Sequence, residues 1–135
     1  MVRDHCLCLH MQRAARVLAR RFDDALRPFG LTNGQFSMLM SLNRPVPPAM
    51  APVASLLAMD RTTLTAALKP LERRGLVKIA KDSSDRRSRI LHLTEAGRRL
   101  LADALPVWQK THHEIEQLAP EMDWDVLRNQ LKAIG

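Results

Sequence analysis

The stretch "MDRTTLTAALKPLERRGLV", residues 59–77, is the most informative part of the chain for its fold. It predicts a helix over 61–74 that begins after an Asp60 N-cap and ends before Gly75. Threonine is a poor helix former, because its branched Cβ loses rotamer freedom against the preceding turn. Three threonines nevertheless lie in the first turn and a half. Helix stability alone therefore does not explain this segment.

The same helix has two opposite faces on a wheel of about 100° per residue. The apolar face consists of Leu64, Ala67, Leu68 and Leu71. The other face consists of Thr62, Ala66, Lys69 and Arg73, with Thr65 at its edge. Small side chains let a helix backbone approach base edges in the major groove, where threonine can hydrogen-bond bases or offer its methyl group to thymine. An ordinary amphipathic surface helix is the alternative.

A β-hairpin with a basic tip is predicted after this helix. Its strands are expected at 76–80 and 89–93, and its tip region carries Asp82, Asp85, Arg86, Arg87 and Arg89. An arginine on a narrow hairpin can enter the minor groove and respond to its width and potential. The two aspartates are expected to accept hydrogen bonds in the turn or to orient an arginine. A solvated turn with offsetting charges is the alternative, but a helix and a basic hairpin in tandem are rarer by chance than either alone.

The rest of the chain is predicted to be helical from three- and four-residue periodicity, caps and prolines. Helices are expected at 5–27, 32–42, 51–58, 95–118 and 121–133, and the long one is expected to bend at Pro106. The expected buried positions include Phe36, Leu39 and Met40 on the second helix and Met122, Val126, Leu127 and Leu131 on the last. A chain of 135 residues fits one domain. Its element order predicts a mainly α fold with a small β-hairpin wing, a winged helix-turn-helix.

The charge is unevenly distributed along the chain, whose formal net charge is +7. Residues 60–99 contain 11 Lys/Arg against 5 Asp/Glu, whereas residues 100–135 contain 3 against 6. A basic block suits a polyanion, and the mixed faces of the first helix argue against a membrane surface. A sequence-blind basic DNA-binding protein is one alternative. We find no glycine-rich phosphate loop, HExxH, GxSxG or clustered acid pair, so neither an enzyme nor a cofactor site is predicted.

Cys6 and Cys8 form no disulfide framework, and on one helix they would point roughly 200° apart. Redox sensing through them is an alternative trigger, although two small residues near a chain end or a dimer seam is the favoured interpretation. His112, His113 and Glu116 share a helix, but adjacent histidines cannot both face one ion, so no metal site is predicted. A wet helix surface, or polar contacts at the dimer interface, is the favoured interpretation of this group. Without an apolar run long enough to span a membrane, or a signal peptide, a cytoplasmic protein is expected.

Five motifs, "LTNGQFSMLMSL", "MDRTTLT", "LERRGLV", "DSSDRRSRILHLT" and "TEAGRRLL", together resemble the MarR family of bacterial transcription regulators over about residues 8–133. The resemblance implies an intertwined homodimer, with dimerisation helices at 1–30 and 95–135 and a DNA-binding lobe at 31–94. It implies a recognition helix at 61–74, with Thr65 at a contact position, and Arg87 as the minor-groove arginine. The full set of expected contacts is Arg61, Thr62, Thr63, Thr65, Lys69 and Arg73 on the helix and Asp85, Arg86, Arg87 and Arg89 on the wing.

The resemblance also implies regulation. Family members typically repress transcription from a near-palindromic operator and release it when a small, often aromatic or anionic, molecule binds, and some sense oxidants through a cysteine on the first helix. The identity of the small molecule does not follow from the sequence. Many relatives carry an arginine where this chain has Ala66, so an operator sequence does not transfer, and the contacts are expected to shift to Arg61, Lys69 and the wing.

Overall fold

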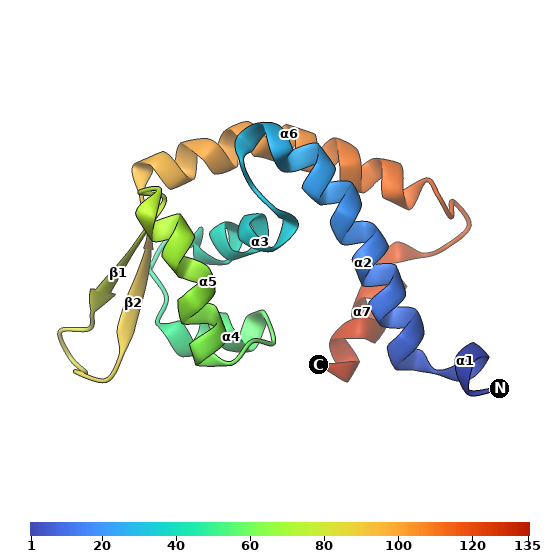
Figure 1. Ribbon diagram of the computed structural model, residues 1–135, viewed down its shortest axis with the longest axis horizontal. Helices are drawn as coiled ribbons and strands as arrows, with labels where there is room; N and C mark the ends of the chain where they lie inside the picture. The colour runs from blue at the N-terminus through green and yellow to red at the C-terminus, as the bar shows by residue number, and fades with distance from the viewer.

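Helices dominate the computed structural model, which describes all of residues 1–135 and contains one antiparallel hairpin (Figure 1). The elements are α1 Val2–His5, α2 Leu7–Leu26, a 3-10 turn η1 Arg27–Phe29, α3 Asn33–Leu42, α4 Met50–Leu56, α5 Arg61–Arg73, β1 Val77–Lys81, β2 Arg89–Leu93, α6 Glu95–Glu116 and α7 Trp124–Ile134. The predicted winged-helix fold class, mainly α with a small hairpin, is confirmed. None of the helices combines the length and apolar character needed to cross a bilayer.

The long helix α6 arches over the molecule (Figure 1). Beneath one end of it lie α3, α4, α5 and the hairpin, whereas α1, α7 and both termini lie toward the other end (Figure 1). A cluster of 20 buried apolar residues fills the space between α3, α4, α5, the hairpin and the inner faces of α2 and α6. Seven leucines and Val53 in it are less than 2% exposed, and full burial of one such side chain contributes roughly 1.5–3 kcal/mol.

The ends of α5 are fixed by the residues predicted to fix them. The Asp60 carboxylate accepts the Thr63 N–H at 2.7 Å and the Thr63 hydroxyl at 2.8 Å. Gly75, with φ of 72°, takes the left-handed conformation that ends the helix. Pro70 lies inside the helix, where its missing N–H leaves the Ala66 carbonyl without its usual partner.

The predicted first helix is interrupted, which corrects the expectation of one helix over 5–27. Cys6 is extended, with ψ of 108°, and its Sγ accepts the Leu9 N–H at 3.4 Å. The thiol thus acts as the N-cap of α2 and separates it from the short α1. Only Cys8 lies within the helix, so the argument that two helical cysteines point apart does not apply.

The C-terminal helix also differs from the prediction of 121–133. It begins at Trp124, because the Asp123 carboxylate accepts the Asp125 and Val126 N–H groups, each at 3.1 Å. None of its residues is buried within the chain. The expected burial of its apolar face is therefore not met by this chain alone: Met122 is 44%, Val126 49% and Leu131 45% exposed.

On α3, Phe36 and Leu39 are buried as predicted, but Met40 is 41% exposed. Met40 lies on the side of α3 that borders a cavity rather than in the core. The capping box at the start of this helix is complete, since Thr32 and Gln35 each accept the other's backbone N–H.

Candidate nucleic-acid interface

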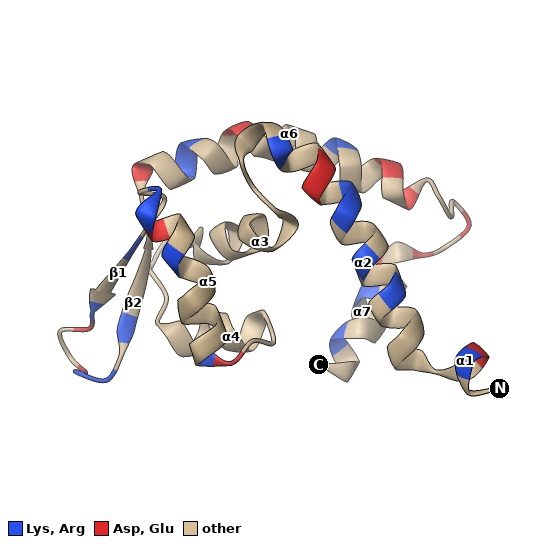
Figure 2. Cartoon of the chain, in the orientation of Figure 1, with Lys and Arg blue, Asp and Glu red and all other residues tan.

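The side chains singled out on α5 lie on its outer surface. Leu64, Leu68 and Leu71 are at most 1% exposed and fix the inner face against the core. Five of the six predicted contact residues are exposed, and Thr65 is half-buried; the five are Arg61, Thr62, Thr63, Lys69 and Arg73. The cations of α5 and the cations at the hairpin tip lie in the same half of the molecule, and the start of α5 and the tip reach its lower edge (Figure 2).

The three threonines of α5 are not equivalent. The Thr63 hydroxyl donates to Asp60, and the Thr65 hydroxyl donates to the Arg61 carbonyl at 2.7 Å. The Thr65 hydroxyl keeps its acceptor lone pairs and its methyl group for another partner. Thr62 is exposed and its hydroxyl makes no side-chain hydrogen bond in the chain. The free hydroxyl donor is therefore Thr62, the threonine that the helical wheel placed on the outer face.

The hairpin pairs β1 with β2 from Val77↔Leu93 to Lys81↔Arg89. In the turn, the Asp82 carboxylate accepts the Ser84 N–H at 3.0 Å and the Ser84 hydroxyl at 2.8 Å. These bonds, the backbone one foremost, hold the pKa of Asp82 below its usual value. Asp85 accepts the Arg87 N–H at 2.9 Å, so both aspartates shape the turn as expected.

The three arginines of the tip have different surroundings. The Arg89 Nη1 donates to the Arg86 and Ser88 carbonyls, both at 3.1 Å, so this guanidinium braces the turn. The Arg86 and Arg87 side chains are exposed and make no hydrogen bond or ion pair within the chain. They are the two free arginines at the tip of the hairpin, and Lys78 and Lys81 on β1 are also exposed.

One arginine that the sequence did not single out connects α5 to the N-terminal part of the chain. Arg74 donates from Nη1 to the Gly30 carbonyl at 2.7 Å and from Nη2 to the Phe29 carbonyl at 3.2 Å. Gly30 has φ of 66°, and a Cβ there would come within 3.1 Å of the Arg74 guanidinium. The C-terminal end of α5 is thus held to the turn that follows α2, a contact between residues 44 positions apart.

A cavity of about 320 Å³ lies between α3, the end of α4 and α6. Its lining residues are Phe36, Ser37, Met40, Ser41, Leu56, Leu57, Leu105 and Trp108. The Phe36 and Trp108 rings stack with centroids 5.8 Å apart and an interplanar angle of 11°. No motif in the sequence indicated this cavity, because its walls are brought together from segments distant in the chain.

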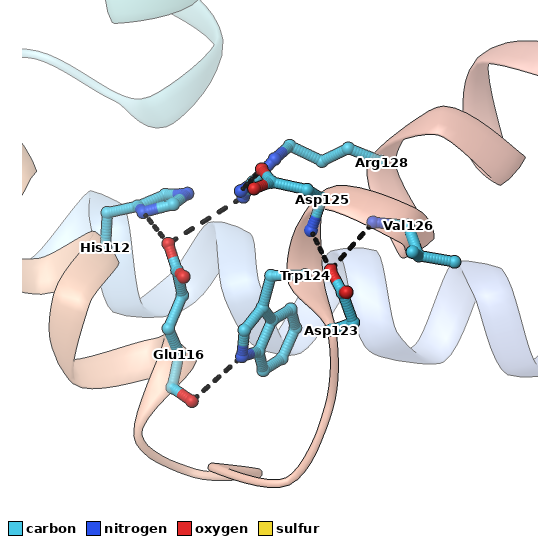
Figure 3. Close-up of polar contacts among 7 residues, drawn as sticks. All are labelled: His112, Glu116, Asp123, Trp124, Asp125, Val126 and Arg128. Carbon is cyan, nitrogen blue, oxygen red and sulfur yellow. Dashed lines mark hydrogen bonds and ion pairs between the residues drawn. The ribbon is translucent and has the colours of Figure 1, made fainter.

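The C-terminal helix is attached to α6 by a polar cluster (Figure 3). His112 stacks on Trp108, with centroids 4.8 Å apart, and its Nδ1 lies 2.8 Å from Glu116 Oε1. Arg128 of α7 lies 3.7 Å from the same carboxylate oxygen, and Trp124 Nε1 donates to the Glu116 carbonyl at 3.0 Å. Glu116, with His112 beside it, therefore joins α6 to α7. The sequence had favoured a wet helix surface or polar contacts at a dimer interface for this group.

Comparisons with known proteins agree with this geometry. A model of the MarR family matches residues 31–88. The transcriptional activatory protein BadR of Rhodopseudomonas palustris is 32% identical over 95 residues, which cover 68% of this chain and 54% of BadR. The chain thus matches about half the length of that relative.

Solved structures match over almost the whole chain. The transcriptional repressor CouR, bound to a 23-mer DNA duplex, has a TM-score of 0.85 at 31% identity, covering 98% of this chain and 94% of CouR. MosR of Mycobacterium tuberculosis, in complex with DNA, has a TM-score of 0.84 at 34% identity, covering 96% and 93%. CouR from Rhodococcus jostii RHA1 with bound p-coumaroyl-CoA has a TM-score of 0.83 at 26% identity, covering 97% and 92%.

CouR and MosR are 31% and 34% identical to this chain over 94% and 93% of their own length, and they share its fold. The family model matches residues 31–88, in the middle of the chain. The chain belongs to the MarR family of transcription regulators, which are DNA-binding proteins and not enzymes.

Proposed function

We propose that this protein binds a near-palindromic double-stranded DNA operator as a homodimer and represses transcription until a small molecule releases it. The observation that carries the proposal is the exposure of α5 and of two unpaired tip arginines, Arg86 and Arg87, in the same half of the molecule. Charged groups that no partner in the chain neutralises are available for phosphates and groove edges. CouR and MosR, which have this fold, are solved with DNA.

Within this proposal α5 enters the major groove and the hairpin tip the minor groove. Thr62 supplies the free hydroxyl, and Ala66 keeps the approach of the backbone to the bases close. Lys69 and Arg73, further along the same face, contact phosphates. Arg87 is the minor-groove arginine, while Arg89 positions the turn that carries it.

A second copy of the chain is the proposed partner for the apolar surface of α1, the start of α2 and α7. These helices expose Val2, Leu7, Leu9, Val126, Leu131 and Ile134, each between 43% and 81% exposed. Large apolar side chains exposed on three helices toward the same end of the molecule suit an interaction site. Residues 1–30 and 95–135 then form the dimerisation helices, and residues 31–94 form the DNA-binding lobe.

The test of the proposal is fluorescence anisotropy at two salt concentrations. The protein is titrated onto DNA from upstream of its own gene and onto a shuffled duplex of the same composition. A preference on the order of 10³ or more for the native piece supports an operator-specific regulator. Equal and strongly salt-dependent binding to both supports the sequence-blind alternative instead. Absence of binding to either at low salt rejects DNA binding.

A thiol trigger is a second candidate, favoured by the position of Cys6. Its sulfur accepts the Leu9 N–H at the start of α2, the position that an anion takes at a helix N-terminus. Cys8 is exposed two residues further on. The candidate predicts that peroxide weakens DNA binding by the wild type and that a reductant restores it. The double variant Cys6→Ser/Cys8→Ser, as control, would keep its affinity; equal losses in both proteins would reject the thiol trigger.

A further inference from the structure

The side chains on the outer face of α5 near its start are short, and each carries a methyl group. Thr62 and Ala66 are exposed one turn apart, and Thr65, three residues after Thr62, is half-buried at the edge of the same face. Residues three and four apart on a helix are neighbours, with Cβ atoms about 5–6 Å from one another. Three methyl groups therefore lie together within the first two turns of α5, at the end that reaches the lower edge of the molecule (Figure 2).

The two hydroxyl groups of this face cannot by themselves distinguish one base from another. The Thr65 hydroxyl donates to the Arg61 carbonyl at 2.7 Å, so its hydrogen is already used within the helix. The exposed Thr62 hydroxyl is free, but one hydroxyl both donates and accepts, and it can pair with the edge of any base. Discrimination between bases at this face therefore has to come from the methyl groups.

The long side chains of α5 that could bind a guanine edge lie away from these methyl groups. Arg61 lies about 100° around the helix from Thr62, on the flank of the outer face. Lys69 shares the face but is seven residues after Thr62, about 10 Å further along the axis. The helix contains no Asn or Gln, the residues that pair bidentately with adenine. The centre of the outer face thus offers methyl groups where a bidentate donor would otherwise select guanine or adenine.

We propose that the first two turns of α5 recognise thymine, whose C5-methyl group packs against the methyl groups of Thr62, Thr65 and Ala66 in the major groove. The inference rests on the operator-binding function proposed above and adds the base that α5 recognises. DNA as the ligand follows from membership of the family, and the methyl groups decide only which base is preferred. Thymine is the base that presents a methyl group in the major groove, and Ala or the Thr methyl contacts it. Each operator half-site accordingly holds A·T base pairs opposite these three residues.

The test begins with a duplex that the wild-type protein itself selects from a random-sequence pool. The selected duplex is prepared in three forms: unmodified, with uracil in place of thymine, and with 7-deazaguanine in place of guanine. Uracil lacks only the C5-methyl group, and 7-deazaguanine lacks the N7 acceptor. Both changes lie in the major groove and leave unaltered the minor-groove edges that the hairpin would contact. Fluorescence anisotropy at one salt concentration gives the dissociation constants.

The uracil duplex should bind more weakly than the unmodified one. Burial of one methyl group changes an equilibrium constant about fourfold, so a homodimer that contacts one thymine methyl in each half-site should lose about fifteenfold in affinity. The 7-deazaguanine duplex should change the dissociation constant by less than about threefold, since no side chain at the centre of the face pairs with guanine. A loss below about threefold with uracil, or a larger loss with 7-deazaguanine than with uracil, overturns the proposal.

One pair of variants assigns the discrimination to these side chains. Thr62→Ser/Thr65→Ser removes two methyl groups and keeps both hydroxyls, including the donor to the Arg61 carbonyl. It should lower the ratio of the uracil and thymine dissociation constants at least about threefold. Thr94→Ser is the matched control, because Thr94 follows β2 at the end away from the hairpin tip and serine keeps the oxygen that accepts the Gly97 N–H at 3.0 Å. An unchanged ratio in the double variant, or an equal fall in the control, overturns the assignment; circular dichroism checks that both variants are folded.

The selection distinguishes failure of this inference from failure of the proposed function. A pool from which no sequence is enriched contradicts both. An enriched near-palindrome without A·T pairs in its half-sites contradicts only the recognition of thymine. An enriched A·T-containing sequence that binds equally well with uracil shows selection by DNA shape, which leaves operator binding standing and rejects the methyl contacts.

Discussion

Substitution of Gly97 by alanine should destabilise the protein, although alanine is the better helix former. Gly97 lies in the first turn of α6, where a Cβ would come within 2.3 Å of the Leu76 carbonyl oxygen and 2.7 Å of Leu93 Cδ1. Real Cβ atoms essentially never approach closer than 3.0 Å, so the carbonyl must withdraw by at least about 0.7 Å. That carbonyl also accepts the Thr94 N–H at 3.1 Å, the bond that joins the start of α6 to the entry of β1.

The net effect follows from three contributions. Overpacking costs about 1–3 kcal/mol, and loss of one hydrogen bond costs about 0.5–1.5 kcal/mol. The higher helix propensity of alanine offsets about 1 kcal/mol of this loss. The free energy of unfolding should therefore fall by about 2 kcal/mol in Gly97→Ala, within a range of about 0.5–3.5 kcal/mol.

Gly34→Ala is the matched control, because Gly34 is also in the first turn of a helix. A Cβ there meets only Thr32 Oγ1 at 3.9 Å, an ordinary contact. This variant should be as stable as the wild type or more stable, by up to about 1 kcal/mol. Urea unfolding at one fixed protein concentration compares the three proteins, since the stability of the proposed dimer would depend on concentration. A Gly97→Ala protein as stable as Gly34→Ala would refute the close-packing argument.

Three further outcomes are expected. Ala58 has φ of 53°, a conformation that strains any residue with a Cβ, so Ala58→Gly should raise the free energy of unfolding in urea by up to about 1 kcal/mol. Ala51→Gly inside α4 should instead lower it by about 0.5–1 kcal/mol. Changes of the same sign in both variants would contradict the strain at Ala58. Arg87→Ala should lower the slope of log K against log salt by about 1.8 for a dimer in the anisotropy assay, and Arg99→Ala on α6, as control, should leave it unchanged. The Thr63 N–H holds the pKa of Asp60 below its usual value of 3.8, so the stabilisation by Asp60 is present above that value and is lost as the pH falls through the lower folded pKa. Acid titration followed by circular dichroism should accordingly show wild type and Asp60→Asn converging in stability below about pH 4, and a constant difference would contradict this.

The parts of the fold that the sequence predicted well are those set by local chemistry. Asp60 and Gly75 bound α5 because a cap acceptor and a left-handed residue act within one turn of the helix end. The hairpin was predicted because its strand and turn residues are contiguous. The errors came where two local signals competed. The Cys6 thiol proved to be the cap of α2, and the Asp123 cap set the start of α7 at Trp124 rather than at the predicted residue 121.

The candidate site was less accessible to sequence reasoning, because its distinctions depend on tertiary contacts. The sequence gives no reason to distinguish the side chains of Arg86, Arg87 and Arg89. In the structure only the Arg89 side chain donates hydrogen bonds to the carbonyls of the turn. The cavity requires Phe36 to meet Trp108 across more than seventy residues of chain. The apolar face of α7 was predicted to be buried, and its exposure follows if its covering surface belongs to another molecule.

The bonds from Arg74 to the Gly30 and Phe29 carbonyls hold the C-terminal end of α5 to the turn after α2, whereas no such bond holds its outer face at the other end. A helix of 13 residues is about 20 Å long, so a tilt of about 10° about the Arg74 end moves the opposite end by about 3.4 Å. That displacement equals the rise of one base pair along a DNA strand, about 3.4 Å. In the proposed DNA complex such a tilt would carry Thr62 about one base step while Arg73 hardly moves. Because Leu64 on the inner face of α5 is fully buried, the core neighbours of this helix would have to move with it.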